Sequence, residues 1–308
     1  MLAVFSIPMR TRFRGIDVRE GMVLSGAAGW GEFSPFTEYA LPVARRWLAA
    51  AREAADEGWP APLRERVPVN VTVPAVGPEH AAAIVRASHG CRTAKVKVAE
   101  RGQPLAADVA RVAAVRDALG PGGRVRVDAN GAWSVDEAAQ AIRALAPHDL
   151  EYVEQPCATL EEMAAVRRRV DVPLAADESV RNAADPLRVA GLGAADIVVL
   201  KVQPLGGVRA ALRVAEACGL PVVVSSALET SVGIAAGVAL AAALPDLPYA
   251  CGLATGQLLT ADVVADPLLV VDGELPVRRP TADPAAMEAH RAAPDRERWW
   301  HARLRAAS

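Results

Sequence analysis

The sequence has very little lysine. Of its 34 basic residues only three are lysines, at Lys95, Lys97 and Lys201, and the others are arginines. Arginine keeps its proton near neutral pH, whereas a lysine in a dry pocket or beside another cation can lose its proton and act as a base. A chain that uses arginine wherever plain positive charge is enough therefore retains lysine where an amine must titrate.

The sequence also has little net charge and no long apolar stretch, and each of these absences excludes a class of protein. The net charge is only −2 and the arginines are spread along the chain, which leaves no basic block for nucleic acid or a membrane surface. The longest apolar stretch, Val232–Leu244, is shorter than the roughly 20 residues of a membrane span. The apolar start, Met1–Phe5, is too short for a signal peptide. We therefore expect a cytoplasmic protein with no membrane span and no nucleic-acid partner.

Cysteine is rare as well. The four cysteines are far apart, and no pair has the CxxC spacing of many zinc sites; they are Cys91, Cys157, Cys218 and Cys251. We expect buried free thiols rather than disulfides or a zinc site.

What the sequence does contain is a repeated pattern of short apolar runs. Residues of hydrophobic type make up 52% of the chain, enough for a large core. From about Val67 onward, runs typical of buried strands alternate with segments of helical period. The eight expected strands are Pro68–Val76, Ala94–Val98, Arg124–Asn130, Tyr152–Gln155, Pro173–Asp177, Ile197–Val202, Val222–Ser226 and Tyr249–Leu253. Eight such units predict a (β/α)8-type barrel; an open doubly wound sheet is the alternative, but its glycine-rich phosphate turn is missing.

Between these strands we expect helices at Leu105–Leu119, Val135–Leu145, Leu160–Arg169, Pro186–Gly191, Val208–Cys218 and Ser231–Leu244. Residues 1–66 read as a small α+β capping domain with strands Met1–Met9 and Met22–Leu24 and a helix Pro42–Glu57. Residues 67–272 form the barrel. The segment 273–308 is expected to fold back on the capping domain and to pack Trp299 and Trp300 rather than to use them as a membrane anchor.

Polar residues, most of them charged, end several of the predicted strands. Barrel enzymes carry their chemistry at the carboxyl ends of the strands, and the residues found there are Lys97, Asp128, Glu154, Asp177, Lys201, Ser225 and Ser226. Three neighbouring carboxylates repel one another unless a cation lies between them, and ligation by oxygen alone favours Mg²⁺ over zinc. The sequence therefore predicts a magnesium site at Asp128, Glu154 and Asp177.

The lysines have two interpretations. They could form salt bridges to these acids, but arginine would serve that purpose better and the chain has many arginines. Lys95 and Lys97 alternate on one strand, so both side chains point to the same face. Two ammonium groups this close repel each other, which favours the neutral, basic form of the amine. We interpret Lys97 as the base.

Several motifs together resemble the enolase superfamily, in its muconate lactonizing subgroup. The motifs are Lys95-Val96-Lys97, Val127–Trp133, Tyr152–Pro156, Asp177-Glu178-Ser179, Leu200–Gly207 and Trp30–Pro35. The resemblance implies that Asp128, Glu154 and Asp177 hold Mg²⁺, which grips a substrate carboxylate while an enolate forms. It implies that Lys97 is the general acid and base, Lys95 its partner and Lys201 the lysine on the opposite face. Asn130 and Glu178 match positions behind the metal ligands, and Arg126 either holds a ligand carboxylate or forms an interior ion pair.

The absence of histidine between His148 and His290 excludes the mandelate racemase branch. The stretches Ser225–Ser231 and Cys251–Gly256 offer hydroxyls and backbone N–H groups that suit a second substrate carboxylate, at Ser225, Ser226, Gly252 and Leu253. They resemble the o-succinylbenzoate synthase family of menaquinone biosynthesis, which implies Mg²⁺-dependent dehydration of 2-succinyl-6-hydroxy-2,4-cyclohexadiene-1-carboxylate, with Mn²⁺ as a substitute to be tested.

The segment Arg10–Glu20 is expected to be a loop over the site, in which Arg14 either meets a substrate carboxylate or stays solvated. An N-acylamino acid racemase or another cycloisomerase is the alternative enzyme. A metal-binding barrel without catalysis is a remote alternative, because it would tolerate arginine at positions 97 and 201.

Overall fold

The chain begins with a three-stranded antiparallel sheet. The computed structural model describes residues 2–181 and 187–308, so Met1 and the expected helix start at Pro186 lie outside it. The strands β1 (Leu2–Phe13), β2 (Ile16–Gly26) and β3 (Gly29–Phe33) pair in that order. β1 and β2 are joined by Arg14 and Gly15, which have φ values of 52° and 77°, as a two-residue hairpin turn requires.

This hairpin corrects two expectations. The strands expected at Met1–Met9 and Met22–Leu24 are each longer, and the segment Arg10–Glu20 consists of the adjoining ends of β1 and β2 and their two-residue turn rather than a long loop. The apolar alternation ends where the strands leave the core, so the hydrophobic pattern could not reveal their full length. The helix expected at Pro42–Glu57 is present as α1 (Leu41–Arg52), continued by the π turn Glu53–Glu57.

The centre of the molecule is a curved parallel sheet. Its strands, in spatial order, are β5 (Val71–Val73), β6 (Thr93–Lys97), β7 (Arg124–Asp128), β8 (Leu150–Glu154), β9 (Leu174–Ala176), β10 (Ile197–Leu200) and β11 (Val222–Val224). Spatial order follows chain order without the reversal of a doubly wound sheet. The segment expected as the eighth strand closes the ring through parallel bridges between Val69 and Cys251 and between Ser225 and Gly252.

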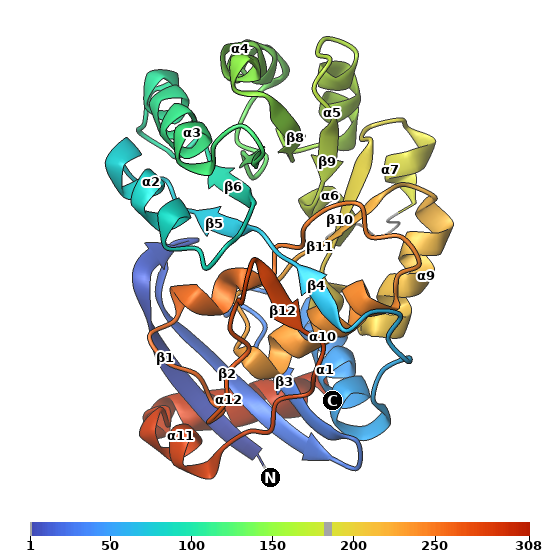
Figure 1. The fold of residues 1–308 in the computed structure, drawn as a ribbon. Helices are drawn as coiled ribbons and strands as arrows, with labels where there is room; N and C mark the ends of the chain where they lie inside the picture. The colour runs from blue at the N-terminus through green and yellow to red at the C-terminus, as the bar shows by residue number, and fades with distance from the viewer. Residues whose placement is uncertain (1, 182–186) are drawn as a thin grey trace.

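Helices join the strands, and the longer ones cover the outside of this sheet (Figure 1). They are α2 (Pro78–Arg86), α3 (Leu105–Leu119), α4 (Val135–Leu145), α5 (Leu160–Arg167), α6 (Glu178–Arg181), α7 (Arg188–Gly191), α8 (Val202–Leu205), α9 (Val208–Cys218) and α10 (Ser231–Ala243), with 3₁₀ turns at Ala146–His148 and Ala254–Leu258. Capping boxes start α4 at Ser134 and α5 at Thr159. Nearly all of α10 is buried, as the apolar stretch Val232–Leu244 predicted.

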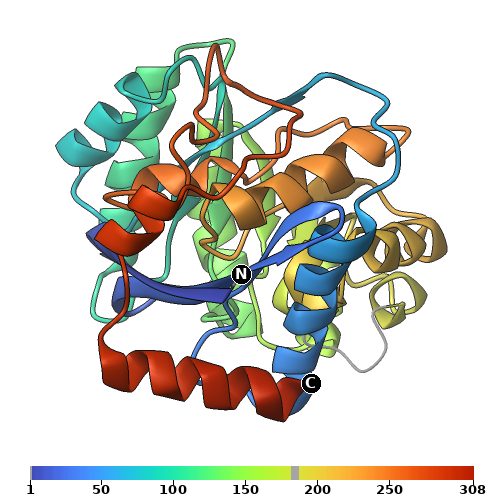
Figure 2. The ribbon, with the colours of Figure 1, turned by 90° about the horizontal axis from the view of Figure 1, so that it is seen from below.

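The end of the chain returns to the N-terminal sheet. β12 (Glu274–Pro276) pairs antiparallel with β4 (Arg66–Pro68), and α11 (Pro284–Ala289) and α12 (Pro294–Ala307) follow. Figure 2 shows α12 lying beneath the sheet and reaching α1. Trp300 is fully buried with its ring 6.0 Å from that of Phe33, so packing is confirmed for this tryptophan. The domain boundaries 1–66, 67–272 and 273–308 stay a prediction.

The expected fold class, a (β/α)8-type barrel with an α+β capping domain, is confirmed. The four cysteines are free and buried, also as expected. In the part of the chain that the structure describes, every helix is too short or too polar to cross a membrane.

Candidate active site

The register of the parallel sheet places the charged residues expected at the strand ends next to one another. Lys97 on β6 pairs with Asp128 on β7, Asp128 with Glu154 on β8, and Glu154 with Ala175 on β9. Asp177 and Lys201 follow directly after β9 and β10. In parallel strands the carboxyl ends share one edge, so these side chains converge at one mouth of the barrel.

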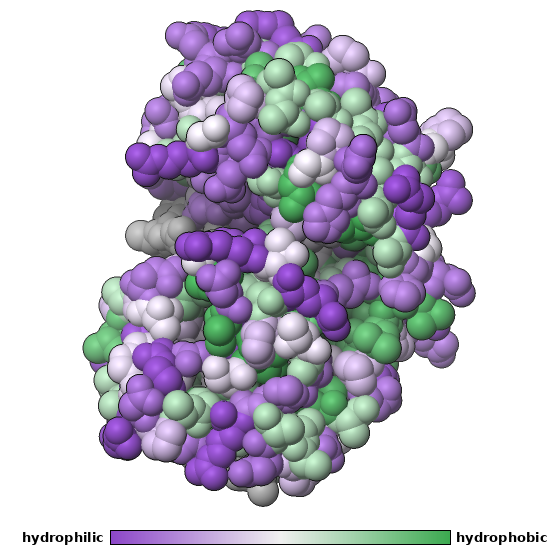
Figure 3. Space-filling model, turned by 90° about the vertical axis from the view of Figure 1, so that its left-hand side faces the viewer, coloured by the Kyte–Doolittle hydropathy of each residue, from purple (hydrophilic) through white to green (hydrophobic). Residues whose placement is uncertain are grey.

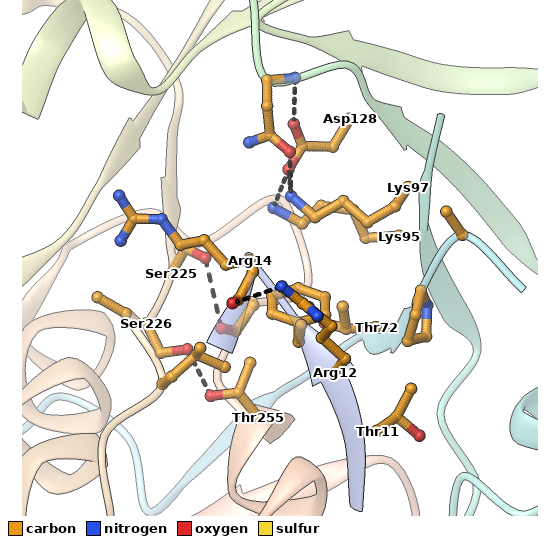
Figure 4. A pocket seen from close by; sticks show the side chains of 18 of the residues that line it. Thr11, Arg12, Arg14, Thr72, Lys95, Lys97, Asp128, Ser225, Ser226 and Thr255 are labelled. Atoms are coloured by element: carbon orange, nitrogen blue, oxygen red, sulfur yellow. Dashed lines mark hydrogen bonds and ion pairs between the residues drawn. The ribbon is translucent and has the colours of Figure 1, made fainter. Parts of the chain in front are cut away.

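The three lysines each contact one or more of the three acids. Lys95 Nζ lies 2.8 Å from Glu154 Oε1 and 3.1 Å from Asp128 Oδ2. Lys97 Nζ lies 2.5 Å from Asp128 Oδ2. Lys201 Nζ lies 2.6 Å from Asp177 Oδ2. All three ammonium groups therefore point into the site, and Figure 4 shows Lys95 and Lys97 extending side by side toward Asp128.

Lys97 is the most accessible of the three lysines. Its side chain is 18% exposed, against 8% for Lys95 and 10% for Lys201. Its Nζ also donates a hydrogen bond of 2.7 Å to Asn130 Oδ1. A base must reach its substrate while its orientation is fixed by neighbours, and Lys97 meets both conditions.

The pKa directions reflect the charges at this mouth. Burial would lower the pKa of Lys95, but the carboxylates of Glu154 and Asp128 outweigh burial and raise it well above its usual value. Burial would raise the pKa of Asp128, yet Lys97 and Lys95 hold it below its usual range. Burial and the neighbouring Asp128 carboxylate raise the pKa of Glu154 to about 7. Lys95 therefore stays a fixed positive charge that holds two acids together.

The chemistry of the donors fits a hard cation. Asp128, Glu154 and Asp177 are each 1% exposed, and carboxylates buried at one mouth of the barrel are stabilised by positive charge between them. Among the described residues, no three acidic, histidine or cysteine side chains are grouped as a formed metal site. The lysine ammonium groups contact one oxygen of each acid, namely Asp128 Oδ2, Glu154 Oε1 and Asp177 Oδ2.

Asn130 lies behind Asp128. Its backbone N–H donates to Asp128 Oδ1 at 3.0 Å, and its side chain donates to Glu178 Oε1 at 3.2 Å. Asn130 has a φ of 48°, a conformation that asparagine tolerates better than most residues. It connects Lys97, Asp128 and Glu178 in one network.

Arg126 does not reach the substrate pocket. Its side chain is fully buried inside the barrel, forms an ion pair with Glu151 and donates to Ala250 O at 2.7 Å. Its guanidinium also stacks on the rings of Tyr152 and Tyr249. Of the two interpretations of Arg126, holding a metal-ligand carboxylate or forming an interior ion pair, the contact with Glu151 favours the ion pair.

The site opens into a cavity of about 870 Å³ between the barrel mouth and the capping domain. Figure 3 shows this side of the molecule hollowed across its middle, with polar side chains along the rim. Lys95, Lys97, Asp128 and Lys201 line the cavity. Ser225, Ser226 and Thr255 line it on the side opposite Lys95 and Lys97 (Figure 4). A cavity of this size holds a small organic substrate.

The residues expected to bind a second carboxylate are only partly in place. Ser225, Ser226 and Gly252 line the cavity. Leu253 does not, because its side chain is 1% exposed and packs against Gly237 of α10. The backbone N–H of Gly252 donates to Val224 O at 2.8 Å, so the expected free N–H at this turn is already used. The hydroxyls are thus the better candidates.

The tip of the β1–β2 hairpin forms part of the cavity wall. Arg14 lines it, with its guanidinium 3.9 Å from the centre of the Phe36 ring and a hydrogen bond of 2.9 Å to Tyr39 Oη. Arg14 Nη2 also lies 3.5 Å from Glu38 Oε1, and the side chain is 35% exposed. Both interpretations of Arg14 stay predictions.

Sequence reasoning missed several residues of the cavity wall. They include Phe36, Tyr39, Thr72 and Glu100, whereas Thr11, Arg12, Phe13, Leu228 and Thr255 lie in segments that were expected at the site. Most come from the capping domain or from loops, where no strand-end rule applies. The motif ending at Pro35 was the only available signal for the neighbouring Phe36.

Comparisons with known proteins agree with this geometry. Residues 79–282 match the family described as Enolase C-terminal domain-like, and residues 4–55 match Enolase N-terminal domain-like. A protein of Thermobifida fusca named o-succinylbenzoate synthase is 71% identical over 94% of both chains. One of the same name from Mycobacterium ulcerans is 57% identical over 99% of this chain and 92% of its own. The chain belongs to the o-succinylbenzoate synthase family of the enolase superfamily.

Solved structures of this superfamily share the fold. A muconate lactonizing enzyme from Pseudomonas fluorescens superimposes with a TM-score of 0.82 over 94% of this chain and 98% of its own, at 22% identity. The L-Ala-D/L-Glu epimerase from Bacillus subtilis superimposes with a TM-score of 0.77 over 92% of this chain and 96% of its own, at 23% identity. At these identities the likeness concerns the fold alone.

Proposed function

We propose that the protein is an o-succinylbenzoate synthase, a hydro-lyase that removes water from 2-succinyl-6-hydroxy-2,4-cyclohexadiene-1-carboxylate in menaquinone biosynthesis. The observation that carries the proposal is the pair of relatives with this name, which are 71% and 57% identical over nearly the whole chain. The inward-facing lysines and buried acids supply the groups that this reaction needs.

Lys97 is proposed as both base and acid. Its neutral amine removes the proton from the carbon that bears the ring carboxylate, and the resulting ammonium gives that proton to the departing hydroxyl. Water is released and the ring becomes aromatic. One amine can serve both steps only if both bonds break on the same face of the ring, the face toward β6.

Lys201 and Lys95 are proposed to stabilise negative charge. Lys201 follows β10, on the far side of the acids from β6, and its ammonium faces the cavity. A buried cation opposite the base stabilises the charge that develops when the proton leaves. Lys95 contacts Glu154 and Asp128 and fixes their positions.

Asp128, Glu154 and Asp177 would hold Mg²⁺. When bound, the ion supplies a Lewis acid that neutralises charge on the substrate carboxylate. Asn130 is hydrogen-bonded to the ligand Asp128, to the base Lys97 and to Glu178, and this network fixes the positions of Asp128 and Lys97. Mn²⁺ prefers similar oxygen ligands, so we propose that it can replace Mg²⁺.

The second carboxylate of the substrate is proposed to lie between Ser225 and Ser226 on one side and Arg14 on the other. All three line the cavity. Ser226 Oγ is hydrogen-bonded to Thr255 Oγ1 at 2.6 Å. Of these two hydroxyls, the one that accepts this bond keeps its own proton and can donate it to a ligand. Arg14 is oriented by Phe36 and Tyr39.

A substrate comparison tests the proposal. Purified protein with Mg²⁺ is offered the cyclohexadiene, followed by ultraviolet absorbance, and in parallel N-succinyl amino acids, followed by optical rotation. We expect rapid dehydration and slow or absent racemisation. Fast racemisation without dehydration would overturn the proposal in favour of an N-acylamino acid racemase. Full activity in Lys97→Ala and Lys201→Ala would indicate a barrel whose lysines are not catalytic.

A further inference from the structure

Arg19 is a buried arginine of β2 that the proposed chemistry does not use. It is 2% exposed. Its Nε donates to Leu228 O at 2.9 Å, its Nη1 to Glu20 O at 3.0 Å, and its Nη2 to both Ser34 O and Ser34 Oγ. A buried cation is tolerated only when its donors are satisfied, and here backbone carbonyls from two separate parts of the fold satisfy them.

One of these parts is the loop Ser225–Thr230, which follows β11. The first four residues of this loop line the cavity. Leu228 has a φ of 66°, a left-handed conformation that is unfavourable for leucine and persists only when surrounding contacts impose it. Those contacts include the hydrogen bond from Arg19 to Leu228 O, a longer one of 3.4 Å to Ala227 O, and a bond from Ala227 N to Glu229 Oε2 at 2.7 Å.

The other part is the capping-domain wall of the same cavity. The Arg19 guanidinium lies 4.6 Å from the centre of the Phe36 ring, and the same ring holds Arg14 at 3.9 Å. Phe36 and Arg14 both line the cavity. Arg19 therefore contacts the barrel wall and the capping wall of the pocket at once, while itself remaining buried.

We propose that Arg19 is a positioning residue that sets the width and shape of the substrate pocket by holding the Ser225–Thr230 loop in its strained conformation against the capping domain. It uses the rigid fork of the guanidinium, whose donors reach several carbonyls together; a lysine could bond to only part of this set. The loop contacts the arm of the substrate that does not react, so its displacement weakens binding more than chemistry.

The kinetic test rests on the proposed function. Arg19→Lys is compared with Arg64→Lys, a matched control in which the arginine also grips carbonyls, those of Ala241, Leu244 and Pro245 at the far end of α10. We expect Arg19→Lys to raise KM for the cyclohexadiene at least tenfold with kcat within twofold of wild type. Arg64→Lys leaves KM unchanged. In a Ser226→Ala background the effect of Arg19→Lys on KM shrinks, because the contact that Arg19 positions is already lost.

Hydrogen exchange tests the loop without any substrate. The amides of Ser226, Ala227 and Thr230 are all hydrogen-bonded, and we expect them to exchange at least tenfold faster in Arg19→Lys and at the wild-type rate in Arg64→Lys. Should Arg19→Lys fail to fold, Ser34→Ala removes one acceptor of Arg19 and should produce smaller changes in the same direction.

Unchanged exchange and unchanged KM in Arg19→Lys would overturn the proposal. Equal losses of kcat in both arginine variants would also overturn it, since they would show a general structural role. A wild-type protein inactive on the cyclohexadiene would refute the proposed function, and the exchange rates would still decide whether Arg19 holds the loop.

Discussion

Replacing the buried acid Glu32 by glutamine should make the protein more stable at alkaline pH. Glu32 is at the end of β3, is 2% exposed, and receives hydrogen bonds at the start of α10. Thr230 Oγ1 donates to it at 2.6 Å, Thr230 N at 3.0 Å and Gly233 N at 3.1 Å. Ser34 Oγ donates to the other oxygen at 2.6 Å. In the glutamine variant the amide oxygen can accept the three bonds from Thr230 and Gly233, and the amide nitrogen can donate a hydrogen bond to Ser34 Oγ.

The magnitude follows from the pKa of Glu32. Burial raises this pKa from 4.5 to about 7; Arg19 opposes the shift and the nearby Glu229 carboxylate adds to it. The folded protein thus holds a proton that the unfolded chain releases above pH 4.5. The contribution of this carboxyl to the free energy of unfolding is fully present below that pH and is lost as the pH rises toward 7. A pKa shift of this size corresponds to roughly 3 kcal/mol.

Urea unfolding at pH 5 and pH 8 measures the effect. Other titrating groups are common to both proteins, so the difference between wild type and Glu32→Gln isolates this carboxyl. We expect equal free energies of unfolding at pH 5 and an advantage of up to about 3 kcal/mol for the variant at pH 8. The same difference at both pH values, or a variant that is less stable at pH 8, would refute the reasoning.

Three further predictions concern metal, core and backbone. Asp128→Asn removes one charged ligand, and calorimetric titration should show Mg²⁺ affinity reduced by at least about tenfold; unchanged affinity would place the metal elsewhere. Trp300→Ala should lower the free energy of unfolding by about 3–5 kcal/mol, clearly more than Trp299→Ala, because only Trp300 is fully buried; equal losses in denaturant titrations would contradict the packing. Gly233→Ala would bring a methyl group within 2.5 Å of a buried side chain and should cost about 1–3 kcal/mol. Gly256→Ala meets open space and should be near neutral in the same titrations.

The core of the site could be predicted because strand geometry is regular. Side chains two residues apart on a strand share a face, which placed Lys95 and Lys97 together, and one strand–helix unit separates each pair of successive acids. The register Lys97–Asp128–Glu154 follows from these rules. The roles of the acids as metal ligands and of the lysines as catalytic groups could be assigned only with the family resemblance, because spacing alone left a salt-bridge interpretation open.

The remaining contacts could not be predicted, because they join distant parts of the chain. Arg19 and Leu228 are separated by 209 residues, and nothing in the local pattern shows that an arginine on a strand will be buried against a loop. Leu253 was expected at the pocket for the backbone N–H groups of the Gly252-Leu253 turn, but Leu253 packs against Gly237 of α10 and does not line the cavity. The hairpin turn Arg14-Gly15 contains a glycine but lacks the Asn-Gly or Asp-Gly pair that marks such turns in a sequence.

The central claim is that the amine of Lys97 moves the proton. The most direct measurement is the rate of o-succinylbenzoate formation by Lys97→Arg with saturating Mg²⁺ and substrate. Arginine keeps the positive charge beside Asp128 but cannot release its proton, so we predict a folded protein of unchanged thermal stability with kcat reduced by about 10²–10⁴-fold. A rate within twofold of wild type would contradict the account.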